Sequence, residues 1–161
     1  MKIGVPKEPE GETRVDIVPS SMKKLTRAGF EVFVEEGAGM AANYHDSDYV
    51  EAGAKIVSRA EALACENLVC IRFPGVDGIA AGTNLACVSD PFRHPEYVKA
   101  CMDANITLLS MDMIPRRLSR AQSMDVNSSQ DNLAGYKAVL LGAAQVPKGI
   151  PMMTTSAGTI R

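Results

Sequence analysis

The stretch Lys55-Ile-Val-Ser-Arg-Ala-Glu-Ala-Leu-Ala-Cys-Glu-Asn-Leu-Val-Cys-Ile71 decides the fold. Its short apolar runs, residues 55–57 and 67–71, are typical of strands, and residues 59–64 between them have the pattern of a short helix. Strands that are apolar throughout and alternate with helices are typical of a parallel sheet covered by helices on both faces. This stretch therefore predicts one strand, helix, strand unit of such a sheet.

The same alternation continues on both sides of this unit. Further strands are predicted at residues 2–5, 32–34, 85–88 and 106–111. Helices are predicted from Pro19 to Gly29 and from Pro95 to Asn105, because Pro favours the first turn of a helix and Gly tolerates the position after its end. The second of these helices should carry Val98, Cys101 and Met102 on one side. We therefore predict an α/β fold with a parallel, doubly wound, flavodoxin-like or Rossmann-like sheet.

A longer helix is predicted at residues 128–145. Asn127 or Ser128 can cap its start, and Pro147 stops it. Apolar residues recur along it at helical spacing and predict a core or interface stripe rather than a cofactor site. The residues of this stripe are Leu133, Tyr136, Leu140 and Ala144.

Composition excludes several classes of function. The formal net charge of the 161 residues is -2, so no positive field favours nucleic acid or anionic lipid. No apolar run reaches the roughly 18–20 residues of a membrane-spanning helix, and no secretory signal opens the chain. We expect a soluble cytoplasmic protein. The four cysteines form no C-x-x-C pair and are expected to be reduced core thiols, not metal ligands.

A polar loop, residues 117–125, is the most promising site for chemistry. Arg117 offers a fork of donors, Gln122 offers both a donor and an acceptor, and Asp125 offers an acceptor able to orient the arginine. Such a set can grip a carboxamide or a phosphate. The loop follows a predicted parallel strand, and sites form outside the carboxyl ends of such strands. The alternative is a solvated loop whose polar residues serve turns and caps.

Residues 111–139, which contain this loop, closely resemble the NAD-binding alpha subunit of proton-translocating NAD(P) transhydrogenases. The opening Met1-Lys-Ile-Gly-Val-Pro-Lys-Glu8 and the closing Pro151-Met-Met-Thr-Thr-Ser-Ala-Gly-Thr-Ile160 agree with the same family. The resemblance implies that Arg117, Gln122 and Asp125 contact the nicotinamide end of NAD(H), and that Ser128 supports the loop. No metal site is expected.

The resemblance also implies a wider assembly. Residues 1–146 would form the N-terminal domain, and residues 147–161 a linker toward a dinucleotide-binding domain of the same subunit. The sequence contains no G-x-G-x-x-G for the pyrophosphate: Gly37-Ala-Gly39 is the nearest spacing, and Ala42 stands at the third position. We expect a homodimer that works with an NADP-binding transhydrogenase subunit and meets the inner membrane only peripherally, through partner subunits. The isolated chain should be inactive.

Two alternatives remain open. The superfamily includes alanine dehydrogenase, in which an Arg, a Lys and a His hold pyruvate; Arg14 matches the first, but Arg72 and Asp90 stand at the other two positions. This departure counts against ketoacid amination, because a His supplies a pKa near neutrality and an Asp does not. The second alternative is a stand-alone interaction domain without catalysis.

Overall fold

The computed structural model describes residues 1–150 and 152–160. The chain divides into two compact units, Met1–Pro115 and Arg116–Arg161.

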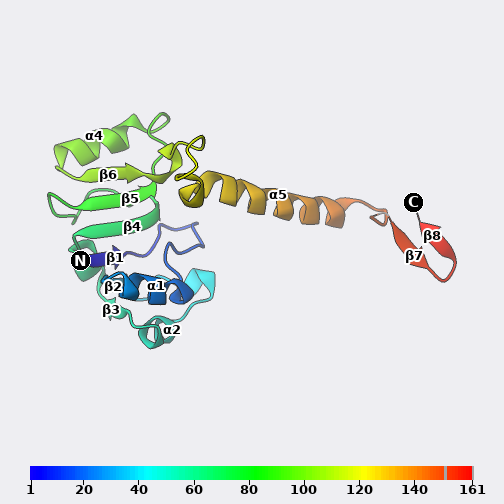
Figure 1. Cartoon of the computed structure of the whole chain (residues 1–161), viewed down its shortest axis with the longest axis horizontal. Coiled ribbons are helices and arrows are strands. Elements are labelled where there is room, and N and C mark those ends of the chain that lie inside the picture. Colours follow the sequence, from blue (N-terminus) through cyan, green and yellow to red (C-terminus); the bar gives the residue numbers. More distant parts are fainter. Residues whose placement is uncertain (151, 161) are drawn as a thin grey trace. The chain divides into compact units, whose positions relative to one another are not determined.

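The first unit is built on a six-stranded parallel sheet, and Figure 1 shows its strands side by side in the order β3-β2-β1-β4-β5-β6. The strands are β1 (Lys2–Val5), β2 (Glu31–Glu35), β3 (Lys55–Val57), β4 (Asn67–Arg72), β5 (Asn84–Val88) and β6 (Thr107–Ser110). The chain first builds outward from β1 to β3 and then crosses back to β4. The predicted parallel, doubly wound sheet is confirmed, and its order reverses between β1 and β4.

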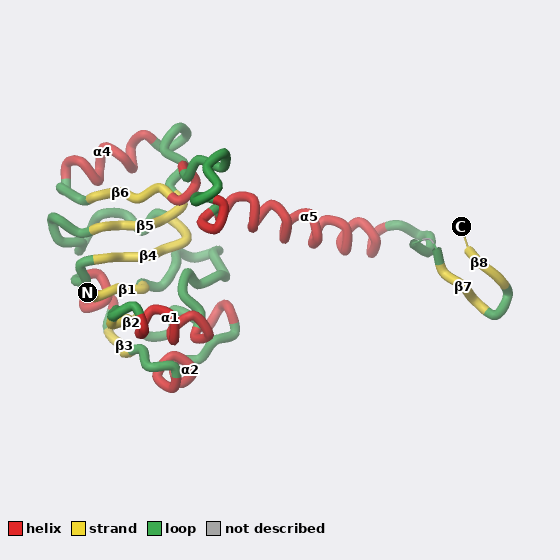
Figure 2. Tube along the Cα trace, viewed as in Figure 1, coloured by secondary structure: helices red, strands yellow, loops and turns green. Residues whose placement is uncertain are grey.

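Helices cover both faces of this sheet (Figure 2). They are α1 (Met22–Arg27), α2 (Asp46–Glu51), α3 (Arg59–Leu63) and α4 (Pro95–Asp103). Met22 of α1 and Tyr49 of α2 are fully buried in one core cluster, with Ile3 and Val34 of the sheet. Leu63 of α3 and Cys101 of α4 belong to a second cluster, whose strand residues are Leu68, Cys70, Leu85 and Cys87. Leu68 pairs with Gly4, the neighbour of Ile3 in β1. Because successive side chains of a strand point to opposite faces, Leu68 and Ile3 lie on opposite sides of the sheet, and so do their clusters.

Two specific contacts fix helices against the rest of the first unit. A Cβ added at Gly4 would collide with the carbonyl oxygen of Ala62 and lie 2.8 Å from Leu68 Cδ2, so only glycine lets α3 lie this near to β1. On the other face, the buried Tyr49 hydroxyl donates to the carbonyl oxygen of Ile17 at 2.8 Å. This bond satisfies the one polar atom of a large core side chain.

The four cysteines are free and buried, which confirms their prediction as core thiols. Burial is the main cause that raises their pKa values, that of Cys87 to about 12. Thiols that stay protonated behave as small apolar side chains.

The apolar side predicted for α4 is only partly buried. Cys101 is buried, but Met102 is 74% exposed. Consecutive helical residues are separated by about 100° around the axis, so the side chain next to a buried one turns away from the sheet. The last predicted strand is also shorter than expected, because Met111 begins a 3-10 turn, η3 (Met111–Met113).

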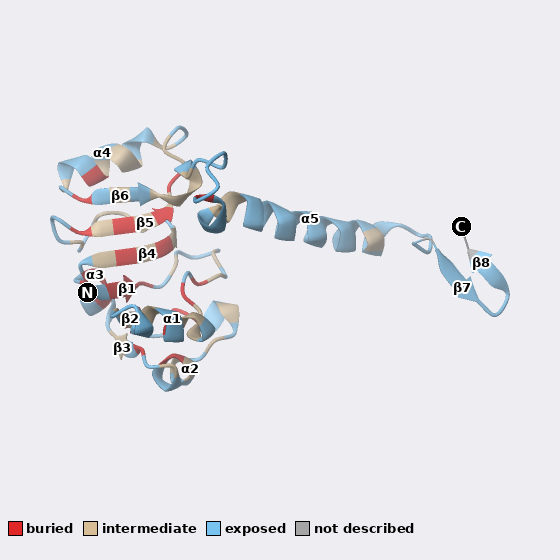
Figure 3. Cartoon of the chain, viewed as in Figure 1, coloured by how far each residue is buried: buried red, intermediate tan, exposed pale blue. Residues whose placement is uncertain are grey.

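The second unit contains the 3-10 turn η4 (Gln122–Met124), the long helix α5 (Val126–Gln145) and a hairpin of β7 (Met153–Thr155) and β8 (Gly158–Ile160). Figure 3 shows α5 exposed along most of its length. Leu133, Tyr136 and Leu140 are 61%, 68% and 48% exposed, so the stripe is not part of a core here. Its role as an interface stays a prediction. None of the helices in the described part of the chain is long and apolar enough to cross a membrane.

Candidate functional site

The polar loop of the second unit presents its donors to solvent. Arg117 and Gln122 are exposed, and Gln122 is the first residue of η4. Ser128, in the first turn of α5, is exposed as well. A ligand approaching this loop would therefore meet a guanidinium, a carboxamide and a hydroxyl that no core packing covers.

Asp125 is the residue that joins the loop to the helix. Its carboxylate accepts hydrogen bonds from Ser128 N at 2.9 Å and from Ser128 Oγ at 2.6 Å. These bonds cap α5, so the prediction of Asn127 or Ser128 as the cap was wrong by two or three positions. The bonds from Ser128 are the main cause that lowers the pKa of Asp125. The charged carboxylate also suits the positive end of the helix dipole.

The arginine that faces Asp125 is Arg116, whose Nε lies 3.7 Å from Asp125 Oδ2. The same guanidinium lies 3.9 Å from Asp131 of α5. Among the described residues, no ion pair joins Asp125 to Arg117. Sequence reasoning missed Arg116, because two adjacent arginines in a loop give no sign of which one turns toward a given carboxylate.

A second group of charges lies at the carboxyl ends of β1 and β4. Glu12 accepts hydrogen bonds from Arg14 Nε at 2.7 Å and Arg14 Nη2 at 2.6 Å, and from Arg72 Nε at 3.0 Å. The hydrogen bonds from Arg14 are the main cause that lowers the pKa of Glu12, to about 2. The fold thus brings Arg14 and Arg72 together on one carboxylate, and Glu12 is a residue that sequence reasoning did not single out.

Glu8 fixes the end of β4 beside this group. Its carboxylate accepts from Ile71 N at 2.6 Å and from Arg72 N at 3.0 Å. Burial is the largest cause that raises the pKa of Glu8, and the charge of Glu12 adds to it. Glu8 is therefore a structural clamp between the loop after β1 and the last residues of β4.

Asp90 belongs to a different network, at the ends of β5 and β6. Its backbone has a φ of +42°, and its N–H donates to Asp112 at 3.0 Å. Asp112 also accepts from Ser89 N at 3.1 Å and from Ser110 Oγ at 2.7 Å. Burial opposes the charge of Asp112, but the bonds from Ser110, Ser89 and Asp90 outweigh it and lower the pKa. This network is built to hold the two strand ends.

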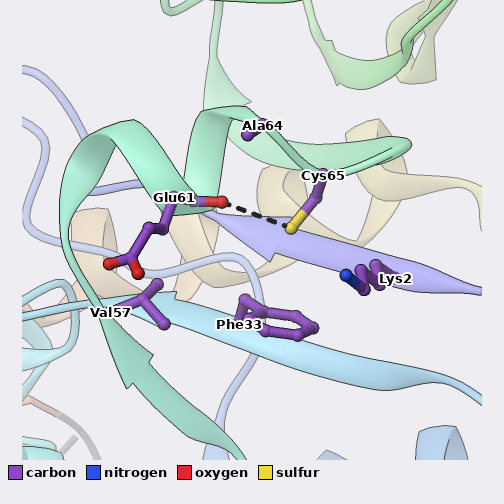
Figure 4. Close-up of a pocket in the computed structure, with 6 residues that line it drawn as sticks. All are labelled: Lys2, Phe33, Val57, Glu61, Ala64 and Cys65. Carbon is purple, nitrogen blue, oxygen red and sulfur yellow. Dashed lines mark hydrogen bonds between the residues drawn. The ribbon is translucent and has the colours of Figure 1, made fainter.

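A hollow of about 260 Å³ lies beside α3 (Figure 4). Its lining residues are Lys2, Phe33, Val57, Glu61, Ala64 and Cys65. The Cys65 thiol donates to the carbonyl oxygen of Glu61 at 3.6 Å, and burial is the main cause that raises its pKa. A protonated thiol is a poor nucleophile, so this hollow offers little chemistry. Among the residues that the structure describes, no three or more His, Cys, Asp or Glu side chains come together in a way that could hold a metal ion.

Comparison with known proteins identifies a family and related folds. The profile of the family described as alanine dehydrogenase/PNT, N-terminal domain, matches residues 4–134. The chain is 44% identical to a Rhodospirillum rubrum protein whose name makes it the first part of NAD(P) transhydrogenase subunit alpha. This similarity covers 99% of the chain and 44% of that protein. The chain therefore spans less than half the length of this relative.

Two solved structures share the fold. The transhydrogenase from Sinorhizobium meliloti superposes with a TM-score of 0.91 at 38% identity, covering 99% of this chain and 49% of that one. An L-alanine dehydrogenase superposes with a TM-score of 0.83 at 29% identity, covering 98% of this chain and 46% of that one.

Proposed function

Because the chain belongs to the alanine dehydrogenase/PNT N-terminal domain family, we propose that it is part of a proton-translocating NAD(P) transhydrogenase and positions the nicotinamide of NAD(H) with residues 117–125. The observation that carries this proposal is the exposed donor set of Arg117 and Gln122 beside the Asp125-capped start of α5. The similarity to transhydrogenase alpha subunits supports it.

The donor set fits a nicotinamide. A carboxamide has one acceptor oxygen and an NH₂ donor, and the side chain of Gln122 offers the complementary pair. Arg117 offers a charged fork suited to the same carboxamide oxygen or to a phosphate. NAD(H), when bound, supplies the hydride. The chain's residues would orient the ring and exclude water from it, which needs little proton transfer by protein groups.

Each residue has a separate role in this proposal. Gln122 holds the nicotinamide or ribose edge, and Arg117 the carboxamide or a phosphate. Asp125 orients the loop through its bonds to Ser128 and its approach to Arg116. Arg116 thereby takes the place beside the carboxylate that Arg117 was expected to fill.

The proposed enzyme contains further domains and subunits. Residues 1–146 would act as the N-terminal domain and 147–161 as the linker to a dinucleotide-binding domain of the same subunit. NADP would lie on a partner subunit, the protein would be a homodimer, and it would be cytoplasmic, meeting the inner membrane only through its partners. Support comes from the Rhodospirillum relative, which is longer than this chain and is named as one portion of a divided subunit.

The test is Gln122→Ala in an enzyme reconstituted with the dinucleotide-binding domain and the NADP-binding subunit. Loss of ring positioning should slow hydride transfer, because a misplacement of about 1 Å costs on the order of 100-fold in rate. Affinity for NADH should change much less, since most contacts would lie on the other domain. Stopped-flow kinetics and equilibrium titration measure the two quantities separately.

Two further variants sharpen this test. Gln145→Ala makes the same chemical change at the exposed last residue of α5, outside the loop, and should leave both quantities unchanged. Arg117→Ala should weaken NADH binding as well as the rate, because it removes a charge and a fork of donors. If Gln122→Ala altered only affinity and left the hydride step intact, the positioning role would have to be given up.

The alternative activity is that of an alanine dehydrogenase, favoured by the similarity to a solved enzyme of that name and by Arg14, whereas Arg72 and Asp90 count against it. An enzyme of this kind, completed with its dinucleotide-binding domain, would produce NADH steadily from alanine and NAD. The transhydrogenase proposal expects no such production.

A further inference from the structure

The hollow beside α3 is a feature of the first unit that the proposed function does not use. Figure 4 shows that its walls come from three strands of the sheet and from the end of α3. None of its lining residues belongs to residues 117–125. Its volume of about 260 Å³ lies just below the usual range of roughly 300–1,000 Å³ for pockets that hold drug-sized ligands. The hollow can therefore accept only a small ligand.

The hollow exists because α3 lies against a glycine of β1. Gly4 pairs with Phe33 of β2, and Phe33 pairs with Lys55 of β3, so all three residues point to the same face of the sheet. The helix covers the Gly4 part of this face, where the carbonyl oxygen of Ala62 lies closest. Phe33, next to it, stays only half-buried. The fold thus leaves an aromatic ring open to the hollow.

Two lysines bring positive charge to this ring. Lys2 Nζ lies 5.4 Å and Lys55 Nζ lies 5.0 Å from the centre of the Phe33 ring. Lys55 also forms an ion pair with Glu31 at 2.7 Å, so its charge is balanced. Within residues 1–150 and 152–160, no carboxylate forms an ion pair with Lys2. The ammonium of Lys2 is therefore the cation in the hollow that an anionic ligand can approach.

The wall from α3 does not compete for that cation. The Glu61 carboxylate accepts hydrogen bonds from Ser58 N at 2.9 Å and from Ser58 Oγ at 2.7 Å, which tie it to the start of the helix. The Cys65 thiol donates to the carbonyl oxygen of Glu61 at 3.6 Å. With its donor used in this way, Cys65 adds to the apolar surface that Ala64 provides. This wall suits an apolar part of a ligand.

We propose that the hollow binds a small aromatic carboxylate, with its ring among Phe33, Val57 and Ala64 and its carboxylate at Lys2. A flat apolar ring matches these walls, because aromatic rings pack well against one another and against aliphatic groups. A carboxylate matches the ammonium, because a hydrogen bond between two charged groups is stronger than a neutral one. An organic cation of the same shape would instead meet Lys2 and Lys55 and be repelled.

Sodium benzoate is the probe, and benzylammonium chloride, a cation of similar shape, is the matched control ligand. Each is titrated into the isotope-labelled full chain and followed by amide NMR, with sodium chloride at equal ionic strength as the blank. Benzoate should give saturable shifts at the amides of Phe33, Val57 and Ala64, with a dissociation constant of about 1–10 mM. Benzylammonium should bind at least about threefold more weakly. Equal binding of the two ligands, or no saturable shift at these amides, would overturn the proposal.

Two pairs of variants locate the ligand. Lys2→Gln removes the cation and should weaken benzoate binding at least about threefold, whereas Lys23→Gln, at an exposed lysine of α1, should leave it unchanged. Ala64→Leu fills the hollow from an exposed position and should abolish the shifts. Ala60→Leu makes the same change at an exposed residue of α3 that does not line the hollow, and should bind benzoate normally. Unchanged binding in Lys2→Gln or Ala64→Leu would contradict the assignment.

The natural chain provides a measurement that does not depend on whether a variant folds. Nuclear Overhauser contacts between the ring protons of benzoate and those of Phe33 should appear as benzoate approaches saturation. Their absence would overturn the proposal even if every variant were unfolded. No part of this test involves NADH or hydride transfer, so its outcome is independent of the role proposed for residues 117–125.

Discussion

At the residue scale, the first unit depends on single carboxylates that each serve several donors. Glu12 joins Arg14 to Arg72, Glu8 holds two amides of β4, and Asp112 holds the ends of β5 and β6. In each arrangement the carboxylate gains several hydrogen-bond donors, and backbone N–H groups near a strand end gain an acceptor. At the carboxyl edge of the sheet, these carboxylates therefore add polar contacts to the apolar packing of the strands.

Glu12 should make the stability of the protein sensitive to acid. Its folded pKa of about 2 lies below its ordinary value of 4.5, so its contribution is present above pH 4.5 and is lost as the pH falls toward 2. Because both arginines are half-exposed, the loss should be only on the order of 1 kcal/mol. Urea unfolding between about pH 6 and about pH 3 measures this difference, with Glu12→Gln as the reference.

Glu8 works in the opposite direction, because its raised pKa favours the folded state as the pH falls. It is present in both proteins, so the comparison with Glu12→Gln isolates the carboxylate of Glu12. Parallel pH profiles for the two proteins would contradict the role of this ion pair.

At the element scale, glycines show how differently the two units are packed. Gly4 lies on β1 directly beneath α3, whereas Gly135, in the interior of α5, has nothing within 4 Å of an added Cβ. The sequence alone marks both positions in the same way, as a glycine inside a regular element. Whether an added methyl group destabilises the protein at such a position depends on how close the neighbouring element lies.

The same substitution should therefore have opposite effects at these two positions. Gly4→Ala should destabilise the first unit by several kcal/mol, because the collision is with backbone and cannot be relieved by a rotamer change. Gly135→Ala should stabilise α5 by about 0.5–1 kcal/mol, since alanine loses less backbone entropy in a helix. Urea unfolding measures the first change and amide exchange in α5 measures the second. A tolerated Gly4→Ala would contradict the close approach of α3 to β1.

At the scale of the whole molecule, the main question is what covers the apolar side chains of α5, which the chain itself leaves exposed. Leu133, Tyr136 and Leu140 share one stripe and are each about half or more exposed. Residues of this kind, gathered on one helix face, invite association with another surface. We therefore predict that the isolated chain self-associates.

Light scattering with size-exclusion chromatography tests this prediction. The double change Leu133→Gln with Leu140→Gln should shift the protein toward monomer, and circular dichroism should show that α5 is retained. Val50→Gln, at a 56% exposed position in the first unit, is the matched control and should leave the association unchanged. A monodisperse natural monomer would count against an interface on α5.

The sequence by itself determined the elements and their parallel arrangement. Short apolar runs alternating with helical segments require crossover connections, and Gly29, Pro95 and Pro147 mark helix ends through local backbone preferences. Pro19 begins a 3-10 turn, Pro19–Ser21, and α1 itself starts at Met22. The residues of the polar loop and its family resemblance could also be found from the sequence. The signals for strands and helix ends are local, because they depend on neighbours within one or two turns of chain.

Only the tertiary structure decided which charges meet. Glu12 and Arg72 are 60 residues apart in the chain, and they touch because the sheet places β4 next to β1. The partner of Asp125 was equally hidden, since Arg116 and Arg117 are chemically the same and only the path of the loop turns one of them toward Asp125. Strand order and side-chain direction are properties of the packed chain, so no local pattern could have supplied these contacts.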